Sequence, residues 1–327
     1  MTKAVLGFDA HAMKPGPLKR FVWLLKRELW EHKTSLVWAP VFIGALLILL
    51  VLLTQMISVS DANIVVNGAP LARLAGSGPP QRFALGLALG FSLWLFFVPA
   101  ILMFFYCLST LYDERADRSV LFWKSLPTSD ALSVGSKAVT ALVVAPLVTA
   151  MVVLGVILAI VCIRFFVMTV FDAQSVAASL PPGLVVLSLA QAVLLIPLHV
   201  IWALPCVGWL LMVSAWARSK PLLWAVGLPV VFFGLLAMFD QMARLNLPMD
   251  WFWRHIVLRV LLSIFPSSWF QLAAWPDGVS VTGPHGVANL AADSLPLLAT
   301  ADLWIGAAAG IAMIAIAIRL RRWREAD

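Results

Sequence analysis

Charged residues are scarce in this sequence, at 12% of 327 residues, and soluble domains carry about twice that share. There are only three cysteines, far apart and each in an apolar stretch, which excludes a disulfide framework and the spacing of a zinc site. The P-loop, H-E-x-x-H and G-x-S-x-G motifs are absent as well. We therefore expect no catalytic residue, no metal ion and no cofactor on this chain.

Apolar residues dominate instead. They make up 62% of the chain and form six long stretches, at 36–58, 83–109, 138–163, 183–216, 221–239 and 303–318. About twenty apolar residues in a helix cross a hydrocarbon core of about 30 Å. Lipid offers no hydrogen-bond partner to backbone N–H and C=O groups, so a segment that crosses it as a single stretch is helical. The sequence thus predicts an all-α integral membrane protein with six transmembrane helices. The fourth stretch is too long to cross straight, and Pro197 and Pro205 predict a kink or break.

Lysine and arginine are distributed unevenly between the two sets of loops. Residues 1–35, the 110–137 loop, the 217–220 turn and the tail 319–327 hold 17 of the 23. The positive-inside rule therefore predicts that both termini lie in the cytoplasm. Because the basic residues are scattered over short segments, they do not predict a nucleic-acid surface.

Residues 18–33 are amphipathic, with apolar residues at helical spacing: Leu18, Phe21, Val22, Leu25 and Leu29. We expect a helix that lies in the membrane interface with this stripe toward the acyl chains. Its polar residues include Lys26, Arg27, Glu28 and Glu31. The helix is either a topology anchor alone or an elbow helix that also contacts a cytoplasmic partner.

The loop at 111–137 combines a cluster of acidic and basic residues with an apolar run. Pro127 predicts the end of a short helix, and Ser129 predicts the N-cap of the next one, with Asp130 in its first turn. One interpretation is a docking site for a cytoplasmic protein; the other is a solvated hairpin whose aromatics dip into the headgroups. The candidate docking residues are Arg115, Asp117, Arg118, Phe122, Trp123 and Lys124.

Residues 240–302 form the longest segment between apolar stretches. Its part 251–270 is apolar but is interrupted by Arg254, His255 and Arg259 and stopped at Pro266, which favours a re-entrant or interfacial helix pair. Such a pair could form an outer gate or simply pack over the helix ends.

His199 is the one clearly intramembrane ionisable residue. It could line a pathway together with Arg254 and Arg259, or satisfy carbonyls that the nearby prolines free. Two Gly-x-x-x-Gly patterns, Gly86 with Gly90 and Gly306 with Gly310, allow close helix approach and could serve a dimer.

Taken together, FVWLLKRELWEH before the first stretch, the loop DERADRSVLFWKSLPTSDALSVGSK and the membrane-dipping segment before the last stretch resemble the permease subunits of ABC-2 type (type V) ABC transporters. In that family this loop carries an acidic and basic cluster, an apolar stretch, an "lPvs" turn and a lysine. The corresponding positions here are 113–118, 120–123, 126–129 and Lys137.

The resemblance implies a permease that pairs with a second permease copy, preferably as a homodimer, and binds two separate ATPase subunits, which hold ATP and Mg²⁺. It implies export across a bacterial cytoplasmic membrane, with a first coupling helix at 119–126, a smaller one at 217–221 and outer re-entrant helices at 250–270. The chain has no evident carbohydrate-binding domain and no large outer domain, which favours a peptide, drug or lipid-like cargo. The alternative is a membrane assembly or signalling partner that docks a cytoplasmic protein through 111–137 and transports nothing.

Overall fold

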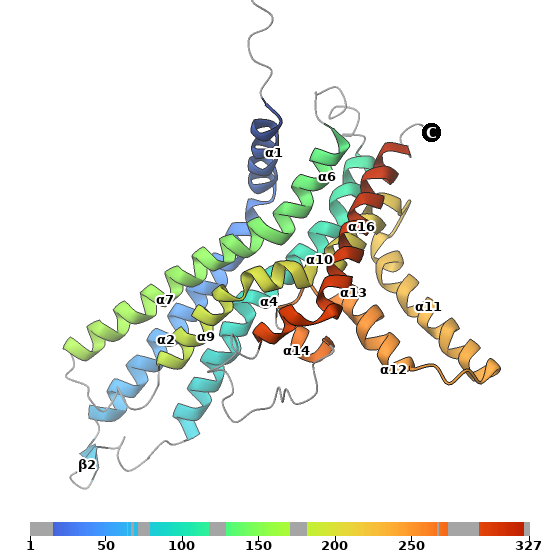
Figure 1. The fold of residues 1–327 in the computed structure, drawn as a ribbon. Coiled ribbons are helices and arrows are strands. Elements are labelled where there is room, and N and C mark those ends of the chain that lie inside the picture. The colour runs from blue at the N-terminus through green and yellow to red at the C-terminus, as the bar shows by residue number, and fades with distance from the viewer. Residues whose placement is uncertain are drawn as a thin grey trace, which may run out of the picture.

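The computed structural model describes residues 16–63, 65–66, 69–70, 79–117, 129–170, 182–266, 268–273 and 294–323 (Figure 1). The first half contains, in order, α1 (Pro17–Glu31), the π-helix η1 (Thr34–Trp38), α2 (Ala39–Asn63), a two-residue antiparallel ladder of β1 (Val65–Val66) and β2 (Ala69–Pro70), α4 (Pro79–Ala116), α6 (Asp130–Val139), the π-helix η2 (Thr140–Val144) and α7 (Ala145–Val170). The second half contains α9 (Pro182–Leu194), α10 (Ile196–Trp216), α11 (Pro221–Ala243), α12 (Met249–Phe252), the π-helix η3 (Trp253–Leu258), α13 (Arg259–Leu262), α14 (Trp269–Leu272), the 3₁₀ helix η5 (Leu295–Ala299) and α16 (Ala301–Trp323).

Six helical spans within the described part of the chain are long and apolar enough to cross a membrane: Thr34–Leu53, Trp94–Ala116, Asp130–Val167, Ile196–Trp216, Pro221–Ala243 and Ala301–Trp323. This confirms the predicted number of spans, and the chain is a multi-pass membrane protein. In Figure 1, α1, the start of α6 and the end of α16 lie at the same end of the molecule, here termed the α1 end.

Two helices extend beyond the apolar stretches from which the spans were predicted. Helix α4 continues past Ser109 to Ala116, and α6 begins at Asp130, ahead of the apolar stretch that starts at Ala138. Hydropathy marks where the apolar residues end, whereas both helices continue through charged residues that are paired inside the protein. The predicted cap is confirmed, since the Ser129 hydroxyl accepts a hydrogen bond from the Leu132 N–H at 3.3 Å.

The predicted break in the fourth stretch is present. Helix α9 ends at Leu194 and α10 begins at Ile196, with Pro197 in the first turn of α10. Proline fits that position because the first helical N–H groups have no intrahelical acceptor. Pro205 lies inside α10 and does not end it.

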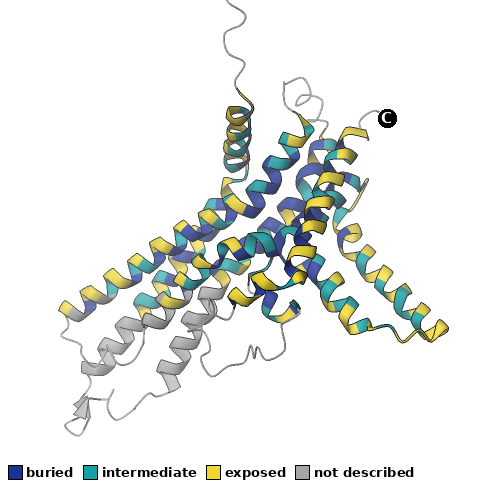
Figure 2. Ribbon diagram, viewed as in Figure 1, coloured by how far each residue is buried: buried dark blue, intermediate teal, exposed yellow. Residues whose placement is uncertain are grey.

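The core lies where α4, α6, α10 and α16 meet, as the dark-blue segments of Figure 2 show. Helices α10 and α16 pack backbone to backbone, because a Cβ on Gly310 would strike the Leu204 carbonyl and one on Gly208 would strike Gly310. Gly310 therefore packs within its own chain, which corrects its interpretation as a dimer contact. The surroundings of Gly86 and Gly90 lie outside the described residues.

Helix α11 stands apart from this core. Ala225 is the only buried residue along it, and the apolar side chains on the rest of the helix are half-buried or exposed (Figure 2). The chain turns beyond Ala243, and the continuous helical segment α12–η3–α13 then runs back toward the middle of the bundle (Figure 1). Fourteen residues rise only about 21 Å, so this segment is too short to cross a membrane.

Candidate functional site

A buried cluster of charged and polar side chains lies at the α1 end, and Lys137 of α6 is at its centre. The Lys137 ammonium lies 2.9 Å from Glu28 Oε1, 2.9 Å from Glu114 Oε1 and 2.8 Å from Thr110 Oγ1. The Lys137 side chain is 3% exposed. Three donors on an ammonium thus meet three acceptors, which is the condition under which a buried charge is tolerated. We call this cluster the Lys137 network; it consists of Glu28, Tyr106, Thr110, Glu114, Asp130, Lys137 and Arg321.

Glu28 joins helix α1 to this network. The Tyr106 hydroxyl donates to Glu28 Oε2 at 2.8 Å, and His32 Nε2 lies 3.9 Å from the same oxygen. Burial opposes ionisation, but the charge and hydrogen bonds of Lys137, then the hydrogen bond of Tyr106, outweigh it, and the pKa of Glu28 is lowered. A carboxyl group whose pKa is lowered on folding stabilises the folded state. This stabilisation is complete at a pH above the ordinary carboxyl pKa of about 4.3, and it is lost as the pH falls through the lowered, folded-state pKa. Glu28 therefore stays ionised at neutral pH, where its carboxylate faces the Lys137 ammonium.

Arg321 of α16 brings the last described helix into the network. Its NH1 lies 2.9 Å from Glu114 Oε2, without the angle of an aligned hydrogen bond, and its Nε lies 3.6 Å from Asp130 Oδ1. Glu114 is in the last turn of α4 and Asp130 in the first turn of α6. The two helices that flank residues 118–128 are thus tied to each other by Lys137 and to α16 by Arg321.

Arg115 makes a second connection at the same end. Its guanidinium donates to the carbonyls of Ser214 and Ala217, at 2.5 and 2.9 Å. These carbonyls belong to the end of α10, where the last helical carbonyls have no intrahelical partner. Arg115 therefore caps α10 and is held within the chain. Of the other candidate docking residues, Asp117 is exposed, while Arg118, Phe122, Trp123 and Lys124 lie outside the described residues.

The four polar residues assigned to the first helix fall on different sides of α1. Lys26 is exposed, and Arg27 pairs with Glu31 at 3.1 Å on the surface. Glu28 is 1% exposed and, with Leu24, forms the side of α1 that packs against the protein.

The predicted apolar stripe of α1 is divided between two surroundings. Leu18 and Val22 are exposed, whereas Phe21, Leu25 and Leu29 are half-buried, and Leu29 packs against the core.

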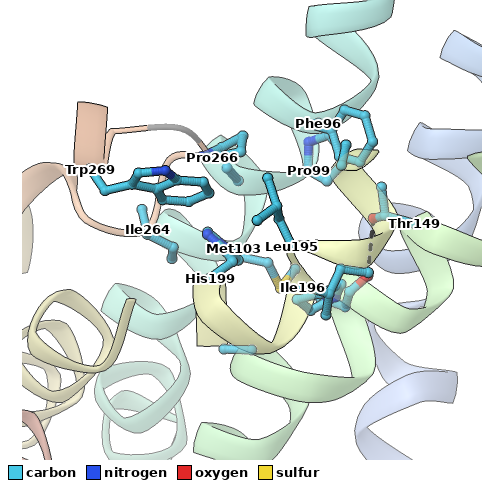
Figure 3. Close-up of a pocket in the computed structure, with 15 residues that line it drawn as sticks. Phe96, Pro99, Met103, Thr149, Leu195, Ile196, His199, Ile264, Pro266 and Trp269 are labelled. Atoms are coloured by element: carbon cyan, nitrogen blue, oxygen red, sulfur yellow. Dashed lines mark hydrogen bonds between the residues drawn. The ribbon is translucent and has the colours of Figure 1, made fainter. Parts of the chain in front are cut away.

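His199 lines a partly open cavity of about 90 Å³ at the junction of α9 and α10. Figure 3 shows its imidazole next to Met103, with Trp269 and Pro266 on another side of the cavity. Among the described residues, the buried Nδ1 has no hydrogen-bond partner, so this nitrogen satisfies no carbonyl freed by Pro197. The walls are otherwise largely apolar.

The two arginines proposed for a pathway have different surroundings. Arg254 is exposed on η3, whereas Arg259 is 4% exposed. The Arg259 guanidinium pairs with Asp302 in the first turn of α16, lies 4.4 Å above the Trp202 ring and packs directly on Gly306. Arg259 thus fastens α13 to α10 and α16.

Sequence reasoning missed most of the Lys137 network, although one signal was present. Tyr106, Thr110 and Glu114 follow one another at four-residue intervals, which places three polar groups on one face of an otherwise apolar helix. Among the described residues, no group of three or more His, Cys, Asp or Glu side chains is placed to hold a metal ion.

No protein-family model, curated protein or solved structure shows a significant match to this chain. The function must therefore be inferred from the residues and their geometry.

Proposed function

We propose that this chain is the permease subunit of an ATP-driven ABC exporter of the ABC-2 type. In this proposal two separate ATPase subunits dock on the 111–137 loop, at its segment 119–126, and drive movement of the adjoining helices α4 and α6. A second permease copy completes the pathway, both termini are cytoplasmic, and the membrane is a bacterial cytoplasmic membrane. The cargo class that fits the short segment 59–82 between the first two spans is a peptide, drug or lipid-like molecule.

The observation that carries this proposal is that the Lys137 network joins the end of α4 and the start of α6, the helices on either side of the docking segment, to α1 and α16. A displacement that reaches the end of α4 or the start of α6 acts on Glu114, Asp130 and Lys137. Through these residues the displacement reaches Glu28 on α1 and Arg321 on α16. Paired charges in a poorly solvated environment resist separation, because each would be left without a partner. A loop so connected is suited to transmitting force, which mere docking of a partner does not require.

Two further features support a transport function. Helix α1, with its exposed Leu18 and Val22, fits an elbow helix in the membrane interface. The segment α12–η3–α13, which runs back from the end of α11 and is fastened by Arg259, fits a re-entrant helix on the outer side. Between them, the α9–α10 break and the His199 cavity supply a place where helices can shift.

Removing the Trp123 indole tests the docking role. We expect Trp123→Ala to weaken association with the ATPase or to uncouple ATP hydrolysis from transport, because a buried interface aromatic commonly contributes about 2 kcal/mol or more. Lys124→Ala is the matched control, since a rim charge contributes much less. The measurements are the amount of P-loop ATPase that copurifies and the transport-linked turnover. Wild-type behaviour of a Phe122→Ala/Trp123→Ala double variant would overturn the docking role; a bound partner without ATP-linked transport would favour the signalling alternative.

Cysteine labelling tests the orientation. A cysteine introduced at Ser77 or at Ser280 should react with an impermeant maleimide added to intact cells, and a cysteine at Ser125 should react only after permeabilisation. The reason is the 17-to-6 asymmetry of lysine and arginine between the two sides. The reverse labelling pattern would place the docking loop outside the cell and would contradict the whole proposal.

A further inference from the structure

A groove of about 400 Å³ opens at the α1 end between the α1–η1 junction, α4 and the start of α11. It borders the Lys137 network, because Tyr106 belongs to that network and also lines the groove. Four further polar residues line it, His32, Ser35, Ser109 and Lys220. Its remaining walls are largely apolar and include Leu102, Phe105 and Leu222.

The polar residues of this groove lie at the level where helices enter the membrane. His32 directly precedes the span Thr34–Leu53, and Lys220 directly precedes the span Pro221–Ala243. Cationic side chains at span ends are at the depth of the lipid headgroups. Along α4 the lining changes from Ser109 to Phe105 and Leu102, which lie up to about 10 Å further from the α1 end. The groove is therefore polar at headgroup depth and apolar below it.

Lys220 is the residue that gives this groove its charge. It is exposed, and no acidic side chain of the described residues lies within ion-pair distance of it. On the opposite wall the His32 ring packs edge-on against Tyr106, with centroids 4.8 Å apart, which fixes the imidazole at the groove. An ammonium and an imidazole across one groove, with two hydroxyl groups, match the oxygens of a phosphate diester.

We propose that this groove binds one anionic glycerophospholipid, with its phosphate between Lys220 and His32 and an acyl chain along Phe105 and Leu102. The amphipathic lining is what distinguishes this occupant from free phosphate, which would leave the apolar walls unused. The proposal does not depend on transport activity, since it concerns the lipid around the folded chain.

Native mass spectrometry of the full chain in neutral detergent tests this proposal. The chain is titrated with phosphatidylglycerol or with phosphatidylcholine of the same acyl composition, and the dissociation constant of the first bound lipid is compared. Lys220→Asn removes the charge and tolerates the left-handed backbone at this position (φ 45°). Arg244→Asn is the matched control, because Arg244 has the same backbone conformation (φ 50°) at the other end of α11 and does not line the groove.

We expect wild type and Arg244→Asn to bind phosphatidylglycerol more tightly than phosphatidylcholine. In Lys220→Asn the ratio of the two dissociation constants should fall about five-fold, since one cation near a lipid surface contributes about 1 kcal/mol. Lys220→Arg should keep it, which separates charge from folding. Millimolar inorganic phosphate should not displace the lipid. The proposal is overturned by equal binding of the two lipids to wild type, by equal losses in Lys220→Asn and Arg244→Asn, or by displacement with inorganic phosphate.

Discussion

Replacing Lys137 with methionine should lower the free energy of unfolding by about 3 kcal/mol or more. Methionine keeps the length and much of the volume of lysine but removes the ammonium from between Glu28 and Glu114, which lie 2.9 Å from it on either side. Removing one partner of a buried pair commonly costs about 3–5 kcal/mol, because the remaining charge stays buried without compensation. The measurement is a reversible unfolding titration in mixed micelles. Lys26→Met on the exposed side of α1 is the control and should cause no measurable change.

A second substitution separates charge from packing in this experiment. In the Lys137→Met background, Glu28→Gln removes one of the two carboxylates that lost their partner, so it should restore part of the stability. In the wild-type background, the same Glu28→Gln should be destabilising. This opposite sign in a double-mutant cycle is the signature of a direct interaction. Additive losses would mean that Lys137 and Glu28 do not interact directly and would contradict the network as described.

Adding a single methyl group at Gly310 should be as damaging as removing a large side chain from the core. The new Cβ would strike the carbonyl of Leu204 and lie 2.8 Å from the Pro205 nitrogen. Because these are backbone atoms, α10 and α16 must separate over their whole contact, and we expect Gly310→Ala to cost about 3 kcal/mol. Gly155→Ala in α7 is the matched control. Its Cβ meets no described atom within 4 Å, and alanine is the better helix former, so stability should be unchanged or slightly higher.

The same pair of variants tests whether the glycine pattern serves one chain or two. If Gly310 packs within its own chain, the Gly310→Ala monomer itself should be less stable in dilute detergent. A variant that unfolds like Gly155→Ala but no longer associates with a second copy would assign the pattern to a dimer, against the contact with Leu204. Gly306→Ala should also be destabilising, because its methyl group would meet the Arg259 guanidinium.

The sequence was sufficient to predict features that depend on neighbouring residues. Span number follows from runs of apolar residues, the break before Ile196 follows from Pro197, and the Ser129 cap follows from a hydroxyl at the right position. In each case the physical cause lies within a few residues of its effect.

The Lys137 network depends instead on residues far apart in the chain. Glu28 and Lys137 are separated by 109 positions in the sequence. The residues near each of them predict only a solvent-exposed charge close to the end of a helix. For the same reason Lys137 and Arg321 counted as loop and tail charges in the orientation argument, although both are buried. Only the packing of α1, α4, α6 and α16 reveals that these charges are paired.

The network also has a consequence for the order in which the protein is made. It joins α1, the first described helix, to α16, the last. Lys137 is synthesised well before Arg321, and at bacterial or eukaryotic rates of translation roughly ten to forty seconds separate them. During that interval Glu114 has one cationic partner where the finished protein provides two. Until α16 is made, the Glu114 carboxylate therefore has only part of the charge pairing that the finished protein gives it, and α16 completes a cluster that α1, α4 and α6 begin.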